Sequence, residues 1–270
     1  MRNRFLVPLA IVSLALACWC AVLAPAQAAA RAKPAAAQSF DPHDLSGPWV
    51  TLGPRLILSN LVPKLTPWAQ AKLAATRPSY GAHAVVPALG NDPMGICDPL
   101  GYPRIMIATI QRPMEIVQIP GRVLQHFEFH ETWRPIWTDG RALPKDPDPR
   151  CNGYAVGKWD GATLVVDSNG FDERSWLDHF GNPHSDQMTL HETYRRVDAD
   201  TLEITMTLTD PKTYAHPWIA DKFIYKNTKT NAEAAKAAGG SELIEEYCVP
   251  SEEQLFNKLQ RDPAAGLKTQ

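Results

Sequence analysis

The strongest constraint on the fold is a series of short segments in which apolar and polar residues alternate. The clearest lies at 202–209, where Leu202, Ile204, Met206 and Leu208 alternate with polar side chains. Because successive side chains of a strand point to opposite faces, this pattern is typical of a strand with one buried face.

Further strands are predicted from residue 113 onward, at 114–119, 122–130, 132–137, 154–159, 163–168, 188–196, 218–225 and 243–249. Turn pairs such as Pro120-Gly121 and Asp160-Gly161 join neighbouring strands. Short connections favour an antiparallel up-and-down order, and closing the sheet removes its exposed edges. The sequence therefore predicts a mainly β protein with a lipocalin-like (calycin-type) barrel. Periodicity alone leaves a two-sheet β-sandwich open as the alternative.

Two helices flank the predicted strands. The first covers 65–75, with Thr66 as its N-cap and Pro67 in the first turn. The second is a C-terminal helix at 251–259, with Ser251 as its N-cap. The stretch 231–240 between the last two strands is rich in Ala, Lys and Gly and is expected to be an exposed excursion.

The N-terminus has the pattern of a signal peptide. A basic start precedes an apolar run at 5–23, and small residues at 24–28 form a cleavage site of the A-x-A type. We therefore expect residues 1–28 to be a signal peptide, 29–40 a flexible leader and 41–270 a single domain. An uncleaved membrane anchor is the alternative, because the apolar run is nearly long enough to span a bilayer. Cleavage predicts a periplasmic or secreted protein with no membrane association.

Composition and missing motifs narrow the functional class. The chain is 44% apolar, which is typical of a globular protein, and its 27 basic and 29 acidic residues nearly balance. Without a basic cluster, no nucleic-acid partner is expected. No P-loop, G-x-G-x-x-G, G-x-S-x-G or C-x-x-C motif is found in the sequence, so no cofactor is predicted.

Several longer segments carry a family resemblance. They are Gly47-Pro-Trp49, CDPLGYPR (97–104), TWRPIWTDGR (132–141), VGKWDGATLVVDSNGF (156–171), WLDHFGNPHSD (176–186) and DPKTYAHPW (210–218). Together they resemble a widespread group of uncharacterised exported bacterial proteins with a lipocalin-like barrel, over most of the mature chain. The resemblance implies export and a barrel, and it implies neither a reaction nor a catalytic residue.

Three cysteines follow the signal peptide, and an exported chain is expected to form one disulfide and keep one free thiol. Cys97 and Cys248 both lie beside prolines and in segments shared with the group that the chain resembles. We therefore predict a Cys97–Cys248 disulfide. Pairing of Cys151 with either of them is the alternative.

The connection at 172–186 is the main candidate for a site, because connections this long in a compact domain are often functional. We expect it to meet the strand entrance at 214–218. His184 is the predicted acid–base residue, Asp178 its orienting carboxylate and Tyr214 a hydrogen-bond donor to a developing oxyanion. The alternative is a structural loop in which the acids cap turns and His184 bonds the backbone.

Other residues are candidates for ligand contact. Aromatic rings suit an aromatic or polycyclic ligand, and an Arg between Trp residues suits a carboxylate or a ring. The predicted ligand-binding residues are Trp176, Trp218, Arg174, His216, Trp133 and Arg134.

A metal site is a weaker alternative. His126, Glu128 and His130 would share one face of a strand at 122–130, where two imidazoles and a carboxylate resemble a ligand set. A solvated strand face explains the same pattern, with Phe127 and Phe129 turned to the core. No metal is therefore predicted.

These features predict an exported β-barrel protein that binds a small hydrophobic or aromatic molecule. Two functional classes stay open. One is a cofactor-independent lyase or isomerase that uses His, Tyr and Asp side chains for acid–base chemistry. The other is a non-catalytic periplasmic carrier or sensor of a small hydrophobic ligand.

Overall fold

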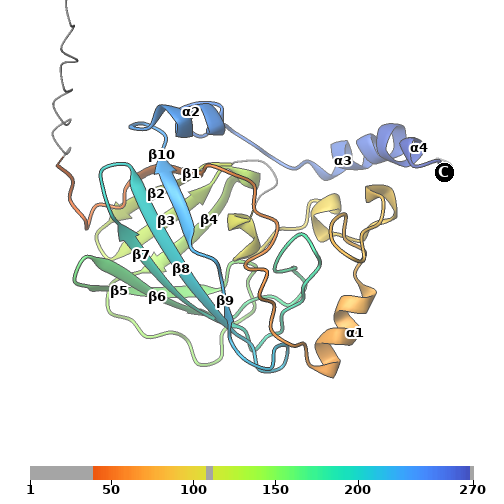
Figure 1. Ribbon diagram of the computed structural model, residues 1–270, viewed down its shortest axis with the longest axis horizontal. Helices are drawn as coiled ribbons and strands as arrows, with labels where there is room; N and C mark the ends of the chain where they lie inside the picture. The colour runs from red at the N-terminus through yellow and green to blue at the C-terminus, as the bar shows by residue number, and fades with distance from the viewer. Residues whose placement is uncertain (1–38, 108–111, 268–270) are drawn as a thin grey trace, which may run out of the picture. The chain divides into compact units, whose positions relative to one another are not determined.

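The computed structural model describes residues 39–107 and 112–267 (Figure 1). The predicted signal peptide and nearly all of the leader lie outside these residues. The strands are β1 Gly47–Thr51, β2 Met114–Ile119, β3 Arg122–Phe127, β4 Thr132–Trp137, β5 Tyr154–Asp160, β6 Thr163–Asn169, β7 Thr189–Arg196, β8 Thr201–Thr209, β9 Trp218–Ile219 and β10 Phe223–Asn227.

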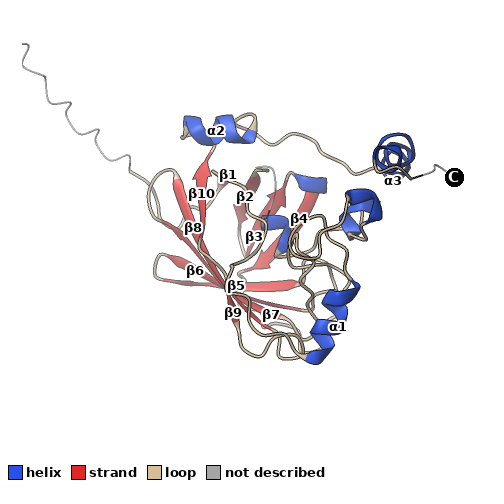
Figure 2. Cartoon of the chain, turned by 45° about the vertical axis from the view of Figure 1, so that its right-hand side comes forward, coloured by secondary structure: helices blue, strands red, loops and turns tan. Residues whose placement is uncertain are grey.

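The sheet closes on itself as a barrel (Figure 2). β1 to β8 pair in chain order, and β10 pairs with both β1 and β8, so that Tyr225 lies opposite Thr51 on one side and Leu202 on the other. The short β9 adds to β8 alone. Closure confirms the barrel and excludes the two-sheet sandwich.

The barrel is mixed rather than wholly antiparallel. β4 and β5 run parallel, with Ile136 opposite Ala155 and Trp137 opposite Val156. A parallel pair needs a long crossover, and the proline-rich connection at 138–153 provides it. This connection returns the chain to the end of the barrel at which β4 began, which corrects the simple up-and-down order.

Three of the predicted strands differ from those in the structure. The third strand stops at Phe127, because the chain turns at Glu128 and continues into residues with positive φ. The expected strand at 218–225 is split into β9 and β10, and 243–249 forms no strand. The Gly47-Pro-Trp49 segment, which carries part of the family resemblance, forms the start of β1.

The N-terminal helix forms as predicted. α1 spans Pro67–Ala75, and the Thr66 side chain accepts a hydrogen bond from the Ala69 amide at 3.2 Å. The predicted excursion at 231–240 contains α2, Ala232–Ala238.

The C-terminal helix begins one residue earlier than predicted. α3 spans Pro250–Phe256, and Val249 rather than Ser251 is its N-cap, because Pro250 occupies the first helical position. A π-helical turn at Asn257–Arg261 and α4, Asp262–Ala264, follow. Residues 241–267 are called the strap below. The strap leaves the barrel after α2 and runs to the helical turns near residue 95 (Figure 1).

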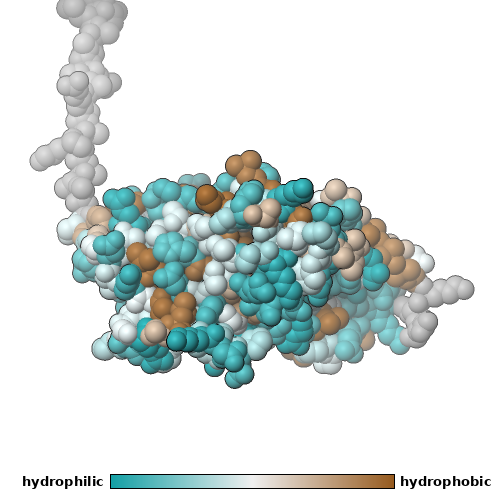
Figure 3. Space-filling view, turned by 90° about the horizontal axis from the view of Figure 1, so that it is seen from below, coloured by the Kyte–Doolittle hydropathy of each residue, from teal (hydrophilic) through white to brown (hydrophobic). Residues whose placement is uncertain are grey.

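Alternating side chains fill the barrel, as the period-two pattern requires. Trp49 is fully buried, and its indole N–H donates to the Leu45 carbonyl at 2.9 Å. The buried apolar residues of the other strands include Met114, Ile116, Val123, Ile136, Leu164, Val166, Leu190, Ile204, Met206, Leu208 and Phe223. The viewed outer face is mostly hydrophilic, with small hydrophobic groups (Figure 3). No helix among residues 39–107 and 112–267 is long and apolar enough to cross a bilayer.

Candidate functional site

An open cavity of about 690 Å³ lies between the strap and the segment at 87–107. Its apolar lining is formed by Met94, Ile96, Leu100, Ile105, Ile107 and Phe129. Cavities of this size that combine an apolar lining with a few polar groups commonly bind small molecules. The cavity is beside the barrel and not within it. We call it the strap cavity.

Short helical turns shape one wall of the strap cavity. The turn Pro93–Ile96 begins at Asp92, whose carboxylate accepts a hydrogen bond from the Met94 amide at 3.0 Å. The same carboxylate is bound by the guanidinium of Arg104 through both terminal nitrogens, one of them at 2.8 Å. Because Arg104 is almost fully buried, this bidentate pair fixes the wall rigidly.

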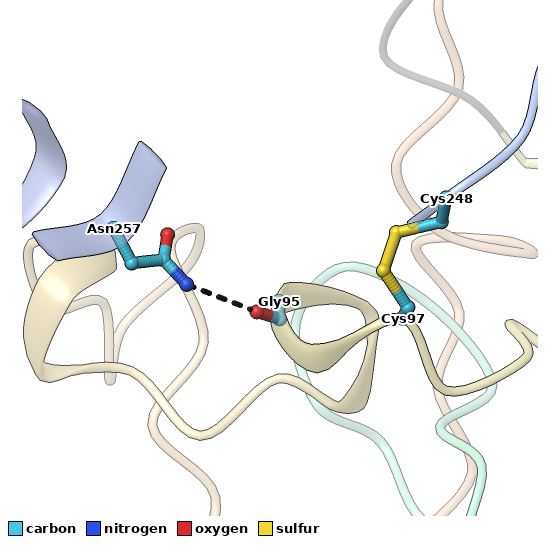
Figure 4. The surroundings of a disulfide bond; sticks show 4 residues. All are labelled: Gly95, Cys97, Cys248 and Asn257. Atoms are coloured by element: carbon cyan, nitrogen blue, oxygen red, sulfur yellow. Dashed lines mark hydrogen bonds between the residues drawn. A yellow bond between two sulfur atoms is a disulfide. The ribbon is translucent and has the colours of Figure 1, made fainter. Parts of the chain in front are cut away.

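The strap forms the opposite wall and is tied to the turns by a disulfide. Cys97 and Cys248 are bonded, with 5.5 Å between their Cα atoms (Figure 4). Farther along, the Asn257 side chain donates to the Gly95 carbonyl at 3.4 Å. The predicted pairing is therefore confirmed, and Cys151 is the free thiol among residues 39–107 and 112–267.

A turn after β3 holds the start of the strap. Glu128 accepts a hydrogen bond from the Ile244 amide at 3.1 Å, and Glu131 accepts one from the Glu246 amide at 3.2 Å. His130 and Glu131 have φ values of 55° and 48°. Left-handed backbone at non-glycine residues costs free energy and tends to persist at functional sites.

An ion pair lies at the edge of the strap cavity. Arg112 donates to Glu246 at 2.9 Å and lies 3.5 Å from Glu128. Burial is the main cause that raises the pKa of Glu246, and the neighbouring carboxylates of Glu128 and Glu131 add to it. The polar edge thus contains a carboxyl group that protonates more readily than an ordinary Glu.

Two histidines line the strap cavity. The Nε2 atom of His179 lies 3.0 Å from the Ile107 carbonyl oxygen, which can only accept, so Nε2 carries the proton. Burial lowers the pKa of His179, and the positive charge of Arg104 lowers it further. Burial also lowers the pKa of His130, whose ring stacks on Phe129. Both imidazoles are therefore neutral near pH 7.

A polar network lies inside the barrel, away from the strap cavity. Arg134 of β4 pairs with Glu192 of β7, and both side chains are fully buried. The guanidinium also donates to Gln125 at 2.7 Å and to Ser168 at 2.8 Å. Its central carbon lies 3.7 Å from the centre of the Tyr102 ring. Arg134 is thus buried in the core and does not line the strap cavity.

Tyrosine hydroxyls complete this network. Tyr102 and Tyr194 both donate to Glu192, the latter at 2.7 Å. Burial raises the pKa of both phenols, so they stay protonated. Tyr102 comes from the CDPLGYPR segment, which therefore reaches into the barrel. The side chains of this network therefore fill this part of the barrel interior.

The connection at 172–186 does meet the strand entrance near 214, as predicted. The Tyr214 hydroxyl donates to the Pro183 carbonyl at 2.9 Å, and its ring packs edge-on against Trp218. Tyr214, Trp218 and His184 are all buried. None of the three is among the residues that line the strap cavity.

The predicted hydrogen bond between His184 and Asp178 does not form. The Asp178 oxygens accept from the Phe180 and Asn182 amides and from the Asn182 side chain, at 2.9, 3.2 and 2.6 Å. The ring nitrogens of His184 instead lie 2.9 Å from the Ser175 hydroxyl and 3.2 Å from the Ser185 carbonyl oxygen. Asp178 organises its own loop, because both of its oxygens are occupied there.

The predicted ligand-binding residues do not gather at one place. Arg174 is 82% exposed and pairs with Asp172, and His216 is exposed. Trp133 lies half-exposed on the outer face of β4, where it stacks on His126, whereas its neighbour Arg134 points inward. Trp176 is buried with the Arg104 guanidinium over its ring. The alternation along β4 separates the expected Arg–Trp pair.

The alternative metal ligands do not share a strand face either, because β3 ends before Glu128. His126 lies 2.8 Å from Glu131, while Glu128 binds Arg112 and the strap. Within the described ranges, no group of three or more His, Cys, Asp or Glu side chains is arranged to hold a metal ion.

Four residues of these sites were not among the predicted site residues: Arg112, Glu246, His179 and Ser175. Arg112 and Glu246 are separated by 134 residues, and no local pattern relates them. One feature of the sequence could have identified Ser175: it lies nine residues before His184 in the same connection.

Comparison of the chain with protein-family models, with curated proteins and with solved structures found no match. The closed barrel is compatible with a lipocalin-like fold.

Proposed function

We propose that this protein is an exported β-barrel protein that binds a small hydrophobic molecule in the strap cavity, as a carrier or sensor. The observation that carries the proposal is the open cavity of about 690 Å³ with its apolar lining. The Arg112–Glu246 pair and the two neutral histidines supply a few polar contacts at its edge. Apolar area supplies most of the affinity in such sites, and the polar groups orient the ligand.

The disulfide supports the same proposal. It ties the strap to the opposite wall, which limits how far the two walls can move apart. A preorganised cavity loses less conformational entropy on binding. The disulfide also fits an oxidising compartment, in agreement with the signal-peptide pattern.

A hydrophobic fluorescent probe, N-phenyl-1-naphthylamine, tests the proposal. We expect it to bind the wild-type protein and to bind Met94→Trp at least about tenfold more weakly, because the indole would fill the cavity, a loss of about 1.4 kcal/mol. Ile219→Trp on the exposed outer face of β9 is the matched control. Equal binding by both variants, with Tm values unchanged, would contradict the proposed site.

Native mass spectrometry of protein purified from its own periplasm complements the probe. A retained small molecule, lost from Met94→Trp, would identify the ligand class. Purified wild-type protein that carries no small molecule and fails to bind the probe would oppose the proposal.

One observation favours a cofactor-independent lyase or isomerase instead. His130 lines the cavity with a left-handed backbone, and such strain is found at catalytic residues. A neutral imidazole can act as a general base. Incubation of the retained ligand with the protein distinguishes the two functions, since only an enzyme changes its structure, and His130→Gln would then slow that change.

A further inference from the structure

Ser175 and His184 form a buried hydrogen-bonded pair that the strap cavity does not use. Both belong to the connection between β6 and β7, and the Ser175 hydroxyl oxygen lies 2.9 Å from Nε2 of His184. Ser175 is 6% exposed and His184 is 1% exposed. A serine within hydrogen-bond reach of an imidazole is the basic unit of an activated nucleophile.

The hydrogen bonds of His184 determine its tautomer. Nδ1 lies 3.2 Å from the Ser185 carbonyl oxygen, which can only accept a hydrogen bond. Nδ1 therefore carries the ring proton, and Nε2 presents its lone pair to Ser175. The serine hydroxyl has a second, longer option in the Asp172 carbonyl at 3.2 Å. This is the tautomer that a general base for serine requires, with a backbone carbonyl in the position of the usual carboxylate.

The surrounding charges suit a base of this kind. Burial lowers the pKa of His184, so the imidazole is neutral and able to accept a proton at pH 7. The negative charges of Asp210, Asp172 and Glu173 act in the opposite direction and favour the imidazolium once it forms. Asp210 is held in place by the Ser185 hydroxyl at 2.7 Å.

Ser175 is one of the residues that line a small surface crevice. The crevice measures about 30 Å³ and is lined by Ser175 together with Asp98, Cys151, Asp172, Arg174 and two prolines. Gly101 packs directly over the serine, because a Cβ atom at this position would lie 2.6 Å from the hydroxyl oxygen. A crevice of this size has room for only about one or two water molecules, so only the smallest acyl groups could approach the serine and a long chain would not fit.

We propose that Ser175 is a nucleophile activated by His184, and that it accepts a short acyl group from an ester. The hydroxyl oxygen would attack the ester carbonyl carbon while its proton passes to Nε2 of His184. The ester C–O bond then breaks, and the departing alcohol takes that proton. Water, deprotonated by the same imidazole, next attacks the acyl-serine and releases a carboxylic acid, which restores both side chains.

The test uses 4-nitrophenyl acetate and a fluorophosphonate probe with the full mature protein in a Cys151→Ala background, which removes the adjacent thiol. We expect hydrolysis of the ester, and a single fluorophosphonate adduct that peptide mapping places on Ser175. Ser175→Ala should abolish both, and His184→Gln should slow both by about 10²–10⁴-fold. Ser251→Ala, at an exposed serine, is the matched control.

Three results would overturn the proposal. These are an adduct on another residue, no adduct on the folded protein, and equal rates for His184→Gln and its parent. If Ser175→Ala does not fold, the pH dependence of fluorophosphonate labelling is measured instead. The labelling rate should rise with pH as His184 loses its proton. A rate that does not change with pH would contradict activation of Ser175 by His184. Because this site is separate from the strap cavity, its failure leaves the binding proposal intact.

Discussion

Two Arg–Glu pairs in this molecule lie in opposite surroundings. Arg134 and Glu192 are both 0% exposed inside the barrel, whereas Arg112 and Glu246 are 30% and 25% exposed at the edge of the strap cavity. The buried pair is surrounded by hydrogen-bond partners from two further strands, β3 and β6, from β7 itself and from the loop that carries Tyr102. The outer pair is partly exposed to water.

The difference implies that the two pairs have different roles. The buried pair restricts how the strands can pair, whereas the outer pair can be displaced by a ligand. A buried pair gains little net stability over apolar residues, but it tolerates only one arrangement of its neighbours. The Arg134 network therefore favours one register of β3, β4, β6 and β7. An exposed pair contributes about 0–1 kcal/mol and can yield to a ligand without loss of the fold.

The largest expected effect comes from breaking the inner pair. Arg134→Ala leaves Glu192 buried without its cation, and we expect a loss of about 3–5 kcal/mol in the free energy of unfolding. Urea unfolding of the variant and of Arg195→Ala, an exposed residue on β7, would measure it. A double variant, Arg134→Met with Glu192→Leu, should recover much of the loss. Equal stability of Arg134→Ala and Arg195→Ala would disprove the contrast between the two pairs.

The next effect concerns the disulfide. The two cysteines are separated by 151 residues, and we expect Cys97→Ser with Cys248→Ser to cost about 2–4 kcal/mol. Because the bond also ties the strap, probe binding in the strap cavity should weaken in the same variant. Cys151→Ser is the control for the removal of a thiol. Unchanged binding would mean that the strap is held by its other contacts.

A change of pH should act on the buried imidazoles. Burial lowers the pKa of His179 and His184, so the unfolded chain takes up protons first as the pH falls below about 6.5. Their contribution to stability is therefore complete above that pH and is lost as the pH falls toward the folded pKa values. Tm measured above and below about pH 6.5 should fall as the pH is lowered. The fall should be less steep for His184→Gln than for the wild-type protein.

The smallest effect on stability should come from the outer pair. Arg112→Ala should cost about 0.2–1 kcal/mol, because the pair is partly solvated. Ligand or probe affinity should change more than Tm does, since the guanidinium lies at the cavity edge. A loss of stability as large as that of Arg134→Ala would show that the strap is part of the folding core.

Local chemistry predicted most of the secondary structure. The alternation at 202–209 and the Asp160-Gly161 turn placed β8 and the β5–β6 hairpin, because the two faces of a strand and the φ values of a turn depend on neighbouring residues. Thr66 placed the start of α1 for the same reason. The Cys97–Cys248 bond was also anticipated, with help from the family resemblance.

Only the tertiary structure decided where the chemistry lies. The parallel pairing of β4 with β5, the filling of the barrel by Tyr102 and the joining of Arg112 to Glu246 all depend on contacts between distant segments. His184 could be predicted as a candidate because it lies in a long connection. Its hydrogen-bond partner is Ser175 and not Asp178, because the Asp178 carboxylate is bound within its own turn. Alternation along the chain determined which residues are buried, and closure of the barrel determined which of them meet.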